Sequence, residues 1–385
     1  MKLPAFFRGD KRWAALVLPA FFVAVGIGVA VTPRPVRAPL PTEAPAPVPT
    51  HPVHLPLPSE VRGFYWNAQT AGTARGDQLI GYAKQTGLNA VVVDLKADNG
   101  AIAFTPKDES LRRYAMDKPL IADVEALTAK LADAGLYRIA RLAVMKDNVF
   151  TAAHPEASLR NKGGGYWRDK TGVAWLDPAA PVVGDTALAL AREAYARGFD
   201  EIQLDYVRFP SDGVLSAIVY PFFKPGEQTE TDVMRAFFEK VAGTLKAEQI
   251  PVSADLFGMT YWQENDFGIG QRLRDVLPTV DFVSPMVYPS HYPPNFKGYG
   301  NPAEFPYEIV KESVDAGAAL IEQETGGLPA ETRRKTRPWL QDFDIGAVYT
   351  AAKIEAQIKA ARDAGASGWM LWNARNVYEP ANYLE

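Results

Sequence analysis

The 385-residue chain contains no cysteine, and it has only four histidines. The lack of cysteine excludes disulfides, thiolate nucleophiles, zinc fingers, iron–sulfur clusters and lipid attached to a cysteine. Four histidines are too few for a His-rich metal site to be expected. We therefore expect no metal centre of that kind and no bound cofactor.

Two motifs of common enzyme classes are also missing. No Gly-x-Ser-x-Gly elbow is present and no serine motif accompanies the histidines, which argues against a serine hydrolase. No Gly-x-x-x-x-Gly-Lys-Ser/Thr is present, which argues against a nucleotide-binding P-loop. The 41 basic and 45 acidic residues give a net charge of −4. This balance predicts no broad basic surface for nucleic acid.

The first 31 residues have the pattern of a membrane-targeting segment. Residues 1–12 are basic, and residues 13–31 form an uncharged run that is long enough to cross a bilayer as a helix. We expect a cytoplasmic arm over 1–12 and a transmembrane signal anchor over 13–31. A cleaved signal peptide is the alternative, because Gly28-Val29-Ala30 offers small residues for cleavage. Both interpretations place the remainder in the periplasm or cell envelope, or outside the cell if the helix is cleaved.

Proline dominates the next segment, residues 32–58. Ten of the 26 residues from Pro33 to Pro58 are proline, which prevents helix and sheet from propagating and predicts a stiff spacer. His51 and His54 fall here, and we interpret them as solvated linker residues. Residues 59–385 then form the functional domain. They carry 35 basic and 43 acidic side chains, a net charge of −8.

From Val61 onward, short apolar runs alternate with segments of helical period, the pattern of parallel β/α units. The expected strands are Val61–Trp66, Ala90–Leu95, Tyr137–Val144, Glu201–Tyr206, Val252–Phe257, Phe282–Tyr288, Arg337–Phe343 and Gly368–Trp372. The expected helices are Gly76–Thr86, Ile121–Ala134, Pro181–Arg197, Thr231–Glu248, Tyr307–Ala319 and Ala351–Ala364. Eight such units in one series predict an α/β fold, a (β/α)₈ TIM barrel.

Polar side chains gather where these strands end, which is where barrel enzymes place their chemistry. Asp205 ends the fourth run, and alternation along the strand puts its side chain inside the barrel or at its rim, with Gln203. Asp255 stands at the same level on the next strand. Neighbouring strands are about 4.8 Å apart, so these two carboxylates can flank one glycosidic bond. We assign Asp205 as nucleophile or general base and Asp255 as general acid/base.

Other strand-end residues are expected to bind substrate. Asp94 and Lys96 would add a carboxylate and a cation to the same rim, either to hold sugar hydroxyls or as a buried ion pair. Arg208 would keep a catalytic carboxylate ionised, or would fix the loop before Pro210. The aromatic and amide side chains in this set are Tyr206, Trp262, Tyr288, Trp372 and Asn373. Aromatic faces at strand ends could stack on the C–H faces of sugars.

The chain resembles the glycoside hydrolase family of bacterial barrel proteins that was first known as a domain of unknown function, and more distantly the glycosyl-hydrolase-like enzymes of the cell envelope. The motifs that carry the resemblance are Arg62-Gly-Phe-Tyr, Asn89-Ala-Val-Val-Val-Asp-Leu-Lys, Trp175-Leu-Asp-Pro, Asp205-Tyr-Val-Arg-Phe-Pro, Val252-Ser-Ala-Asp-Leu-Phe-Gly and Asp281-Phe-Val-Ser-Pro-Met-Val-Tyr. The resemblance implies a barrel that acts on a glycan. It implies that Asp205 matches the strand-four carboxylate of α-glycosidase-like barrels, and that Asp255 matches the strand-five position, where relatives generally have glutamate.

The predicted function is hydrolysis of an envelope or extracellular polysaccharide. The net charge of the domain makes a neutral or cationic, partly deacetylated amino-sugar polymer a more natural substrate than a strongly anionic one. Two alternatives remain open. The barrel could bind or scaffold glycan without cleaving it, or Asp94, Asp205 and Asp255 could hold a divalent metal in a polysaccharide-modifying enzyme. The sequence leaves the oligomeric state undetermined.

Overall fold

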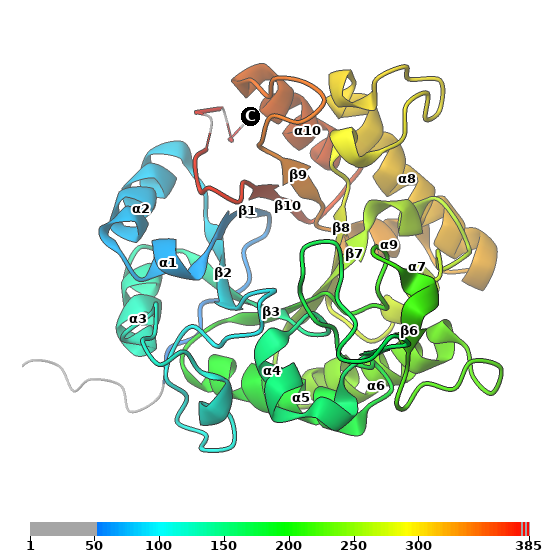
Figure 1. The fold of residues 1–385 in the computed structure, drawn as a ribbon. Helices are drawn as coiled ribbons and strands as arrows, with labels where there is room; N and C mark the ends of the chain where they lie inside the picture. The colour runs from blue at the N-terminus through cyan, green and yellow to red at the C-terminus, as the bar shows by residue number, and fades with distance from the viewer. Residues whose placement is uncertain (1–51, 379, 382, 385) are drawn as a thin grey trace, which may run out of the picture. The chain divides into compact units, whose positions relative to one another are not determined.

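A computed structural model describes residues 52–378, 380, 381, 383 and 384. Eight parallel strands close into a barrel in the order β1-β10-β9-β8-β7-β5-β3-β2, with helices around the outside (Figure 1). The barrel strands are β1 (Val61–Trp66), β2 (Ala90–Lys96), β3 (Tyr137–Ala143), β5 (Glu201–Asp205), β7 (Val252–Phe257), β8 (Phe282–Met286), β9 (Trp339–Gln341) and β10 (Gly368–Trp372). The predicted (β/α)₈ barrel is confirmed.

The helices are α1 (Ala68–Ala71), α2 (Ala74–Thr86), α3 (Val124–Asp133), α4 (Asn148–Ala153), α5 (Pro181–Ala196), α6 (Glu230–Ala247), α7 (Leu273–Val276), α8 (Pro306–Thr325), α9 (Pro329–Arg334) and α10 (Ala351–Asp363). Local chemistry fixes several of their ends. A capping box between Thr229 and Asp232 starts α6, and Gly87 ends α2 in the left-handed conformation that glycine adopts without strain.

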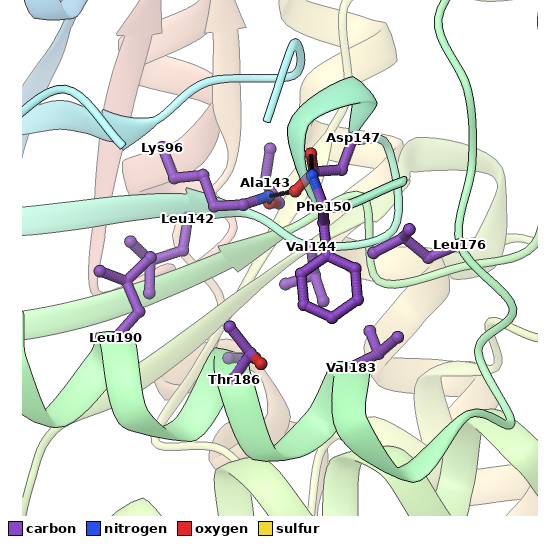
Figure 2. Close-up of a pocket in the computed structure, with 11 residues that line it drawn as sticks. Lys96, Leu142, Ala143, Val144, Asp147, Phe150, Leu176, Val183, Thr186 and Leu190 are labelled. Atoms are coloured by element: carbon purple, nitrogen blue, oxygen red, sulfur yellow. Dashed lines mark hydrogen bonds and ion pairs between the residues drawn. The ribbon is translucent and has the colours of Figure 1, made fainter. Parts of the chain in front are cut away.

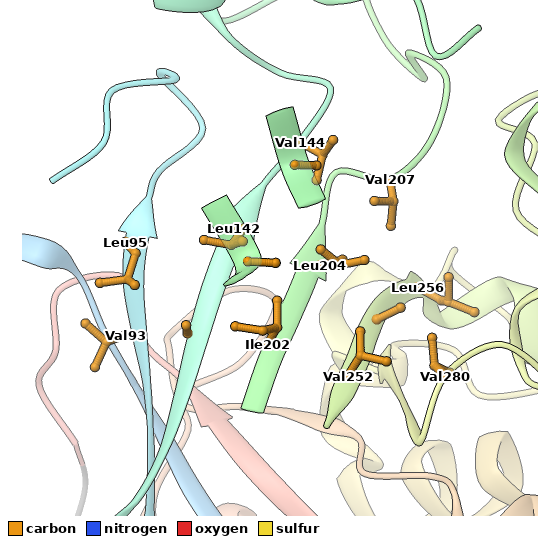
Figure 3. Packing of buried hydrophobic residues seen from close by; sticks show 14 of the residues in the cluster. Val93, Leu95, Leu142, Val144, Ile202, Leu204, Val207, Val252, Leu256 and Val280 are labelled. Carbon is orange, nitrogen blue, oxygen red and sulfur yellow. The ribbon is translucent and has the colours of Figure 1, made fainter. Parts of the chain in front are cut away.

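The hydrophobic core has two parts, separated by the wall of the barrel. Outward side chains such as Leu142, Leu204 and Leu256 pack between the strands and the helices, and Figure 3 shows this layer. Inward side chains such as Val92, Ile139 and Met370 fill the barrel itself. Because strand side chains alternate, each strand supplies both layers, which fixes the register of the inward polar residues described below.

The prediction from sequence is most accurate for the barrel strands. Three of the eight have the predicted bounds, and β9 is shorter than predicted because only Trp339–Gln341 pairs with its neighbours. The main structure that the sequence did not predict lies in the segment between β3 and α5. It contains α4 and β4 (Arg160–Asn161), and β4 pairs antiparallel with β6 (Ile218–Val219) from the segment after β5. Two-residue strands leave too little periodicity to be found from sequence.

The predicted spacer does not remain free of the domain over its last residues. His54 is half-buried, and its ring stacks on Tyr195 with the centroids 4.0 Å apart. Leu55 N donates to Asp200 Oδ1 over 2.8 Å. The interpretation of His54 as a solvated linker residue is therefore wrong, because its ring packs on the ring of Tyr195.

The predicted arm, anchor and most of the spacer lie outside the described residues. Within the part of the chain that the structure describes, no helix combines the length and the apolar character needed to span a membrane. The expected signal anchor over residues 13–31 thus stays a prediction.

Candidate active site

Three inward carboxylates meet at the carboxyl-terminal end of the barrel around one arginine. Arg141 on β3 pairs in register with Asp94 on β2 and with Gln203 on β5. Asp205 ends β5, and Asp255 on β7 follows Ala254, the register partner of Leu204. Since all of these side chains face inward at neighbouring positions, the fold gathers them into one buried cluster.

Arg141 connects the cluster. Its Nε and Nη2 donate to Asp205 Oδ2 over 3.0 and 2.5 Å, and its Nη1 donates to Asp94 Oδ1. The Nε of Arg141 also lies 3.9 Å from Asp255 Oδ2. One guanidinium therefore contacts all three carboxylates, and it binds two of them through charge-assisted hydrogen bonds.

Asp255 is the carboxyl group whose charge is least supported. It is 2% exposed, and its polar contacts are a 2.8 Å hydrogen bond from Trp339 Nε1 and the longer approach of Arg141. Burial and the neighbouring charge of Asp205 hold the pKa of Asp255 well above its usual range. The surroundings of Asp255 thus favour its protonated form.

Asp205 has the opposite environment. Besides its two hydrogen bonds from Arg141, its Oδ1 accepts the backbone N–H of Tyr206 over 2.5 Å. Tyr206 has φ of 51°, a left-handed conformation that costs a non-glycine residue on the order of 1 kcal/mol or more. This strained turn directs a backbone donor at the carboxylate, so Asp205 is held in place by three N–H donors.

Asp94 has a supporting position in the cluster. Its Oδ2 accepts a hydrogen bond from the Tyr65 hydroxyl and its Oδ1 accepts one from Arg141. Burial raises the pKa of Asp94 despite these partners. Because both of its oxygens are engaged by protein groups, Asp94 orients Arg141 and Tyr65.

Aromatic rings form the walls above the carboxylates. Trp372 stacks on Tyr65 with the centroids 4.0 Å apart, and the guanidinium of Arg141 lies 5.2 Å from the Trp372 ring. Tyr288 is buried, and the charges of Asp255 and Asp205 help burial to raise its pKa well above the usual range. Beside Tyr288 is a cavity of about 560 Å³, lined by Phe257, Gly258, Met259, Met286, Tyr288, Ser290, His291 and Tyr292. Such a wall of rings and a few polar groups suits a sugar.

Lys96 lies apart from this cluster, contrary to the expected arrangement. The pairing of β2 with β3 shifts register between Asp94 and Lys96, so the alternation that would place both side chains inward is broken. Lys96 instead lines a small apolar pocket beside α5, where its Nζ is 2.8 Å from Asp147 Oδ2 (Figure 2). The pairing of Lys96 with Asp94 is therefore wrong, although the alternative of a buried ion pair holds with Asp147 as the partner.

Three other predicted binding residues have structural partners. Trp262 Nε1 donates to Ser313 on α8 over 3.1 Å, and its ring packs against Phe296. Asn373 donates to the carbonyl of Asp342 and accepts from Arg375 N, so both ends of its amide are engaged. Arg208 makes no ion pair with Asp205, and its Nη1 donates to Phe209 O and Ser211 Oγ. Of the two roles expected for Arg208, these hydrogen bonds match the one that fixes the loop before Pro210.

Sequence reasoning missed three members of the cluster: Arg141, Tyr65 and Trp339. A signal for Arg141 was present, since it is a charged residue at an inward position of the third predicted strand, between Ile139 and Ala143. Tyr65 and Trp339 gave no such signal, because aromatic residues in strands are usual core residues.

The metal alternative does not fit this arrangement. The carboxylate oxygens that would bind a cation instead accept hydrogen bonds from Arg141, Tyr65, Tyr206 and Trp339. A guanidinium in the centre of the three carboxylates would repel a divalent ion. Across residues 52–378 and the few described after them, no three His, Asp or Glu side chains are grouped so as to hold a metal.

The chain shares its sequence pattern with a described family. The model of a family described as "Putative glycosyl hydrolase domain" matches residues 63–378. No curated protein matches the chain. A hypothetical protein from Ruminiclostridium thermocellum ATCC 27405 of known structure is 29% identical, with a TM-score of 0.43 over 50% of this chain and 96% of that chain.

Two solved structures with higher TM-scores have a similar barrel. The glycoside hydrolase domain of PgaB (BpsB) from Bordetella bronchiseptica is 16% identical, with a TM-score of 0.56 over 82% of this chain and 94% of that chain. The α-galactosidase TtGalA from Thermus thermophilus is 14% identical, with a TM-score of 0.50 over 83% of this chain and 59% of that chain. At these identities the likeness concerns the barrel alone.

Proposed function

Because the chain belongs to this family of glycosyl hydrolase domains, we propose that it cleaves a polysaccharide by a two-carboxylate mechanism with Asp255 as general acid and Asp205 as nucleophile. The observation that carries the proposal is the contrast between the two environments. Asp255 is buried with a raised pKa, whereas Asp205 accepts three hydrogen bonds from N–H donors. Glycoside hydrolysis needs one protonated and one ionised carboxyl group on either side of the bond.

The chemistry follows from these positions. Asp255 gives its proton to the glycosidic oxygen as the bond to the leaving sugar breaks, and Asp205 attacks the anomeric carbon. Water then hydrolyses the glycosyl ester, and Asp255 takes the proton of that water. Inverting enzymes need about 6.5–9.5 Å between the carboxyl groups to admit a water molecule. Asp205 and Asp255 follow the register pair Leu204 and Ala254 on adjacent strands, which are about 4.8 Å apart, and this spacing is closer to that of retaining enzymes.

Reducing-end release by the full chain on peptidoglycan strands, chitosan-like polymers and α-glucans tests the proposal. We expect one polymer to be cleaved, and we expect Asp205→Asn and Asp255→Asn each to lower kcat by at least about 10³-fold while the fold is retained. Binding without turnover, unchanged by both substitutions, would instead favour a glycan-binding barrel.

The proposed location is the cell envelope, with the barrel held outside the cytoplasm by the first 31 residues. The basic start and the uncharged run after it support this placement. Protease added to intact cells or to spheroplasts tests it. Digestion of the barrel without membrane lysis is expected, and full protection until lysis would contradict it.

A further inference from the structure

Arg208 is a buried cation without a counter-ion in the described part of the chain. It is 7% exposed, and no described carboxylate lies within 4 Å of its guanidinium. The other cations near the site differ, since Arg141 binds Asp205 and Lys146 lies between Asp98 and Asp169. A charge removed from water costs several kcal/mol unless it is paired. The protein therefore maintains a charge at this point that its own carboxylates do not neutralise.

The guanidinium is held by rings and keeps two donors free. Its central carbon lies 4.8 Å from the Trp175 ring, 5.4 Å from the Tyr206 ring and 4.5 Å from the Phe257 ring. Only Nη1 donates hydrogen bonds to described residues. Arg337, at the other end of the barrel, has unpaired nitrogens that are sealed from solvent, but Nε and Nη2 of Arg208 are not among the sealed atoms.

Arg208 stands next to the carboxylate cluster. It follows Asp205 by three residues, and the carboxylates whose charges act on it from beyond ion-pair distance are Asp205, Asp212 and Asp169. Phe257, against which it packs, also lines the cavity beside Tyr288. The free donors thus belong to the same end of the barrel as the proposed catalytic pair.

We propose that Nε and Nη2 of Arg208 bind an oxyanion substituent of the substrate, a carboxylate or a sulfate ester on a sugar. These two N–H groups lie side by side in one plane, the geometry that pairs with two oxygens of one anion. Pairing would supply the missing counter-ion at a largely buried guanidinium, where such a pair is stronger than in bulk water. The assignment of this anion to a substrate rests on the proposed glycosidase function, but the binding itself does not.

The net charge of the domain does not oppose this assignment. At physiological ionic strength, exposed charges more than about 8 Å apart are largely screened, whereas a buried charge acts on its direct neighbour with little screening. One anionic group per binding site can therefore be selected locally by a protein that is acidic as a whole. The proposal therefore predicts a substrate with at least one anionic group, in contrast to the neutral or cationic glycan that the net charge favours.

Binding of paired sugars to the full-length protein, measured by calorimetry or ligand-observed NMR, tests the proposal without any need for turnover. The pairs are glucuronate with glucose, N-acetylmuramate with N-acetylglucosamine, and glucose 6-sulfate with glucose. We expect the anionic member of at least one pair to bind tenfold or more tightly. Arg208→Gln should reduce that ratio to near one, and Arg208→Lys should leave an intermediate ratio because the charge remains without the planar pair of donors.

Arg160→Gln is the matched control, because Arg160 also lies over an aromatic ring, 4.5 Å from that of Tyr166. The ratio should survive this substitution. Equal binding within every pair, no binding of any sugar, or a ratio that Arg208→Gln leaves intact would overturn the proposal. Failure to cleave any polymer, with the ratio present and dependent on Arg208, would instead remove the proposed glycosidase and leave the anion site.

Discussion

At the scale of single residues, the site depends on how one arginine is shared. Arg141 supplies hydrogen bonds to Asp94 and Asp205 but only a longer contact to Asp255. This unequal sharing gives two carboxyl groups that lie together in one barrel different electrostatic surroundings. The same residue type, aspartate, thereby acquires two roles through its surroundings.

Arg141→Met is expected to damage both folding and activity. The substitution leaves Asp94 and Asp205 buried without their cation, which should lower the free energy of unfolding by about 3–5 kcal/mol at neutral pH. Urea unfolding measures the loss. Arg141→Lys keeps the charge but not the paired hydrogen bonds, so it should fall between the wild type and Arg141→Met. Equal stability of all three proteins would contradict the role given to Arg141.

The raised pKa of Asp255 predicts opposite effects of Asp255→Asn on stability and on activity. A carboxyl group whose pKa is higher in the folded than in the unfolded protein contributes stability below its unfolded pKa, and that contribution is lost as the pH rises through the folded pKa. Asn cannot ionise. The Tm of Asp255→Asn relative to that of the wild type should therefore increase as the pH rises from the unfolded pKa of Asp255 to its folded pKa. The activity of the wild type should decline as the pH rises through the folded pKa of Asp255, because the general acid then loses its proton.

Thermal unfolding from pH 4 to 9 measures this difference. Asp185→Asn serves as the control, since Asp185 is an exposed partner of Lys240 and should show no such growth with pH. A constant Tm difference between Asp255→Asn and the wild type would show that Asp255 titrates normally.

At the scale of elements, the irregularity in β2 separates chemistry from packing. The register shift after Asp94 turns Lys96 out of the barrel and toward Asp147, which also caps α4 by accepting the N–H of Phe150. The ion pair thus fastens α4 to the strand edge. Bulges near active sites commonly redirect a side chain in this way.

Lys96→Met should therefore act on stability and leave substrate binding unchanged. The substitution leaves the buried Asp147 carboxylate without its ion-pair partner, and we expect the free energy of unfolding to fall by about 3 kcal/mol. The double variant Lys96→Met, Asp147→Asn removes both charges and should recover part of that loss. Urea unfolding measures the effect on stability, and KM for the cleaved polymer measures the effect on substrate binding. A large rise in KM with unchanged stability would restore Lys96 to the binding site.

At the scale of the whole domain, the chain before β1 belongs to the barrel. Val53 O accepts a hydrogen bond from Arg138, and Leu55 N donates to Asp200, which itself binds Arg138. These contacts join the entering chain to the base of β3. The described residues that precede β1 are therefore part of the folded unit.

A truncated protein that begins at Ser59 should be less stable than one that begins at Pro52. Without residues 52–58, the buried Arg138 loses its bond to Val53 and Asp200 loses its bond to Leu55, which together should cost about 1–3 kcal/mol. Comparison of the two proteins by thermal unfolding checks this. Identical Tm values would show that the segment only rests on the surface.

The sequence by itself determined the class of fold and the identity of the two central carboxylates. Alternating apolar runs and helical segments specify parallel β/α units, and strand period places the side chains of Asp205 and Asp255 on the inward face. Local patterns of this kind need no knowledge of distant contacts. The family to which the chain belongs was predicted from motifs of the same local kind.

Only the tertiary structure decided which groups meet. Arg141 joins Asp94 and Asp205 across 47 and 64 residues of sequence, and Trp339 reaches Asp255 across 84. The bulge in β2 likewise depends on the register of its pairing with β3, and the fold places no described carboxylate within ion-pair distance of Arg208. Sequence period gives the face on which a side chain lies, but closure of the barrel sets its partners, and the partners set the charge.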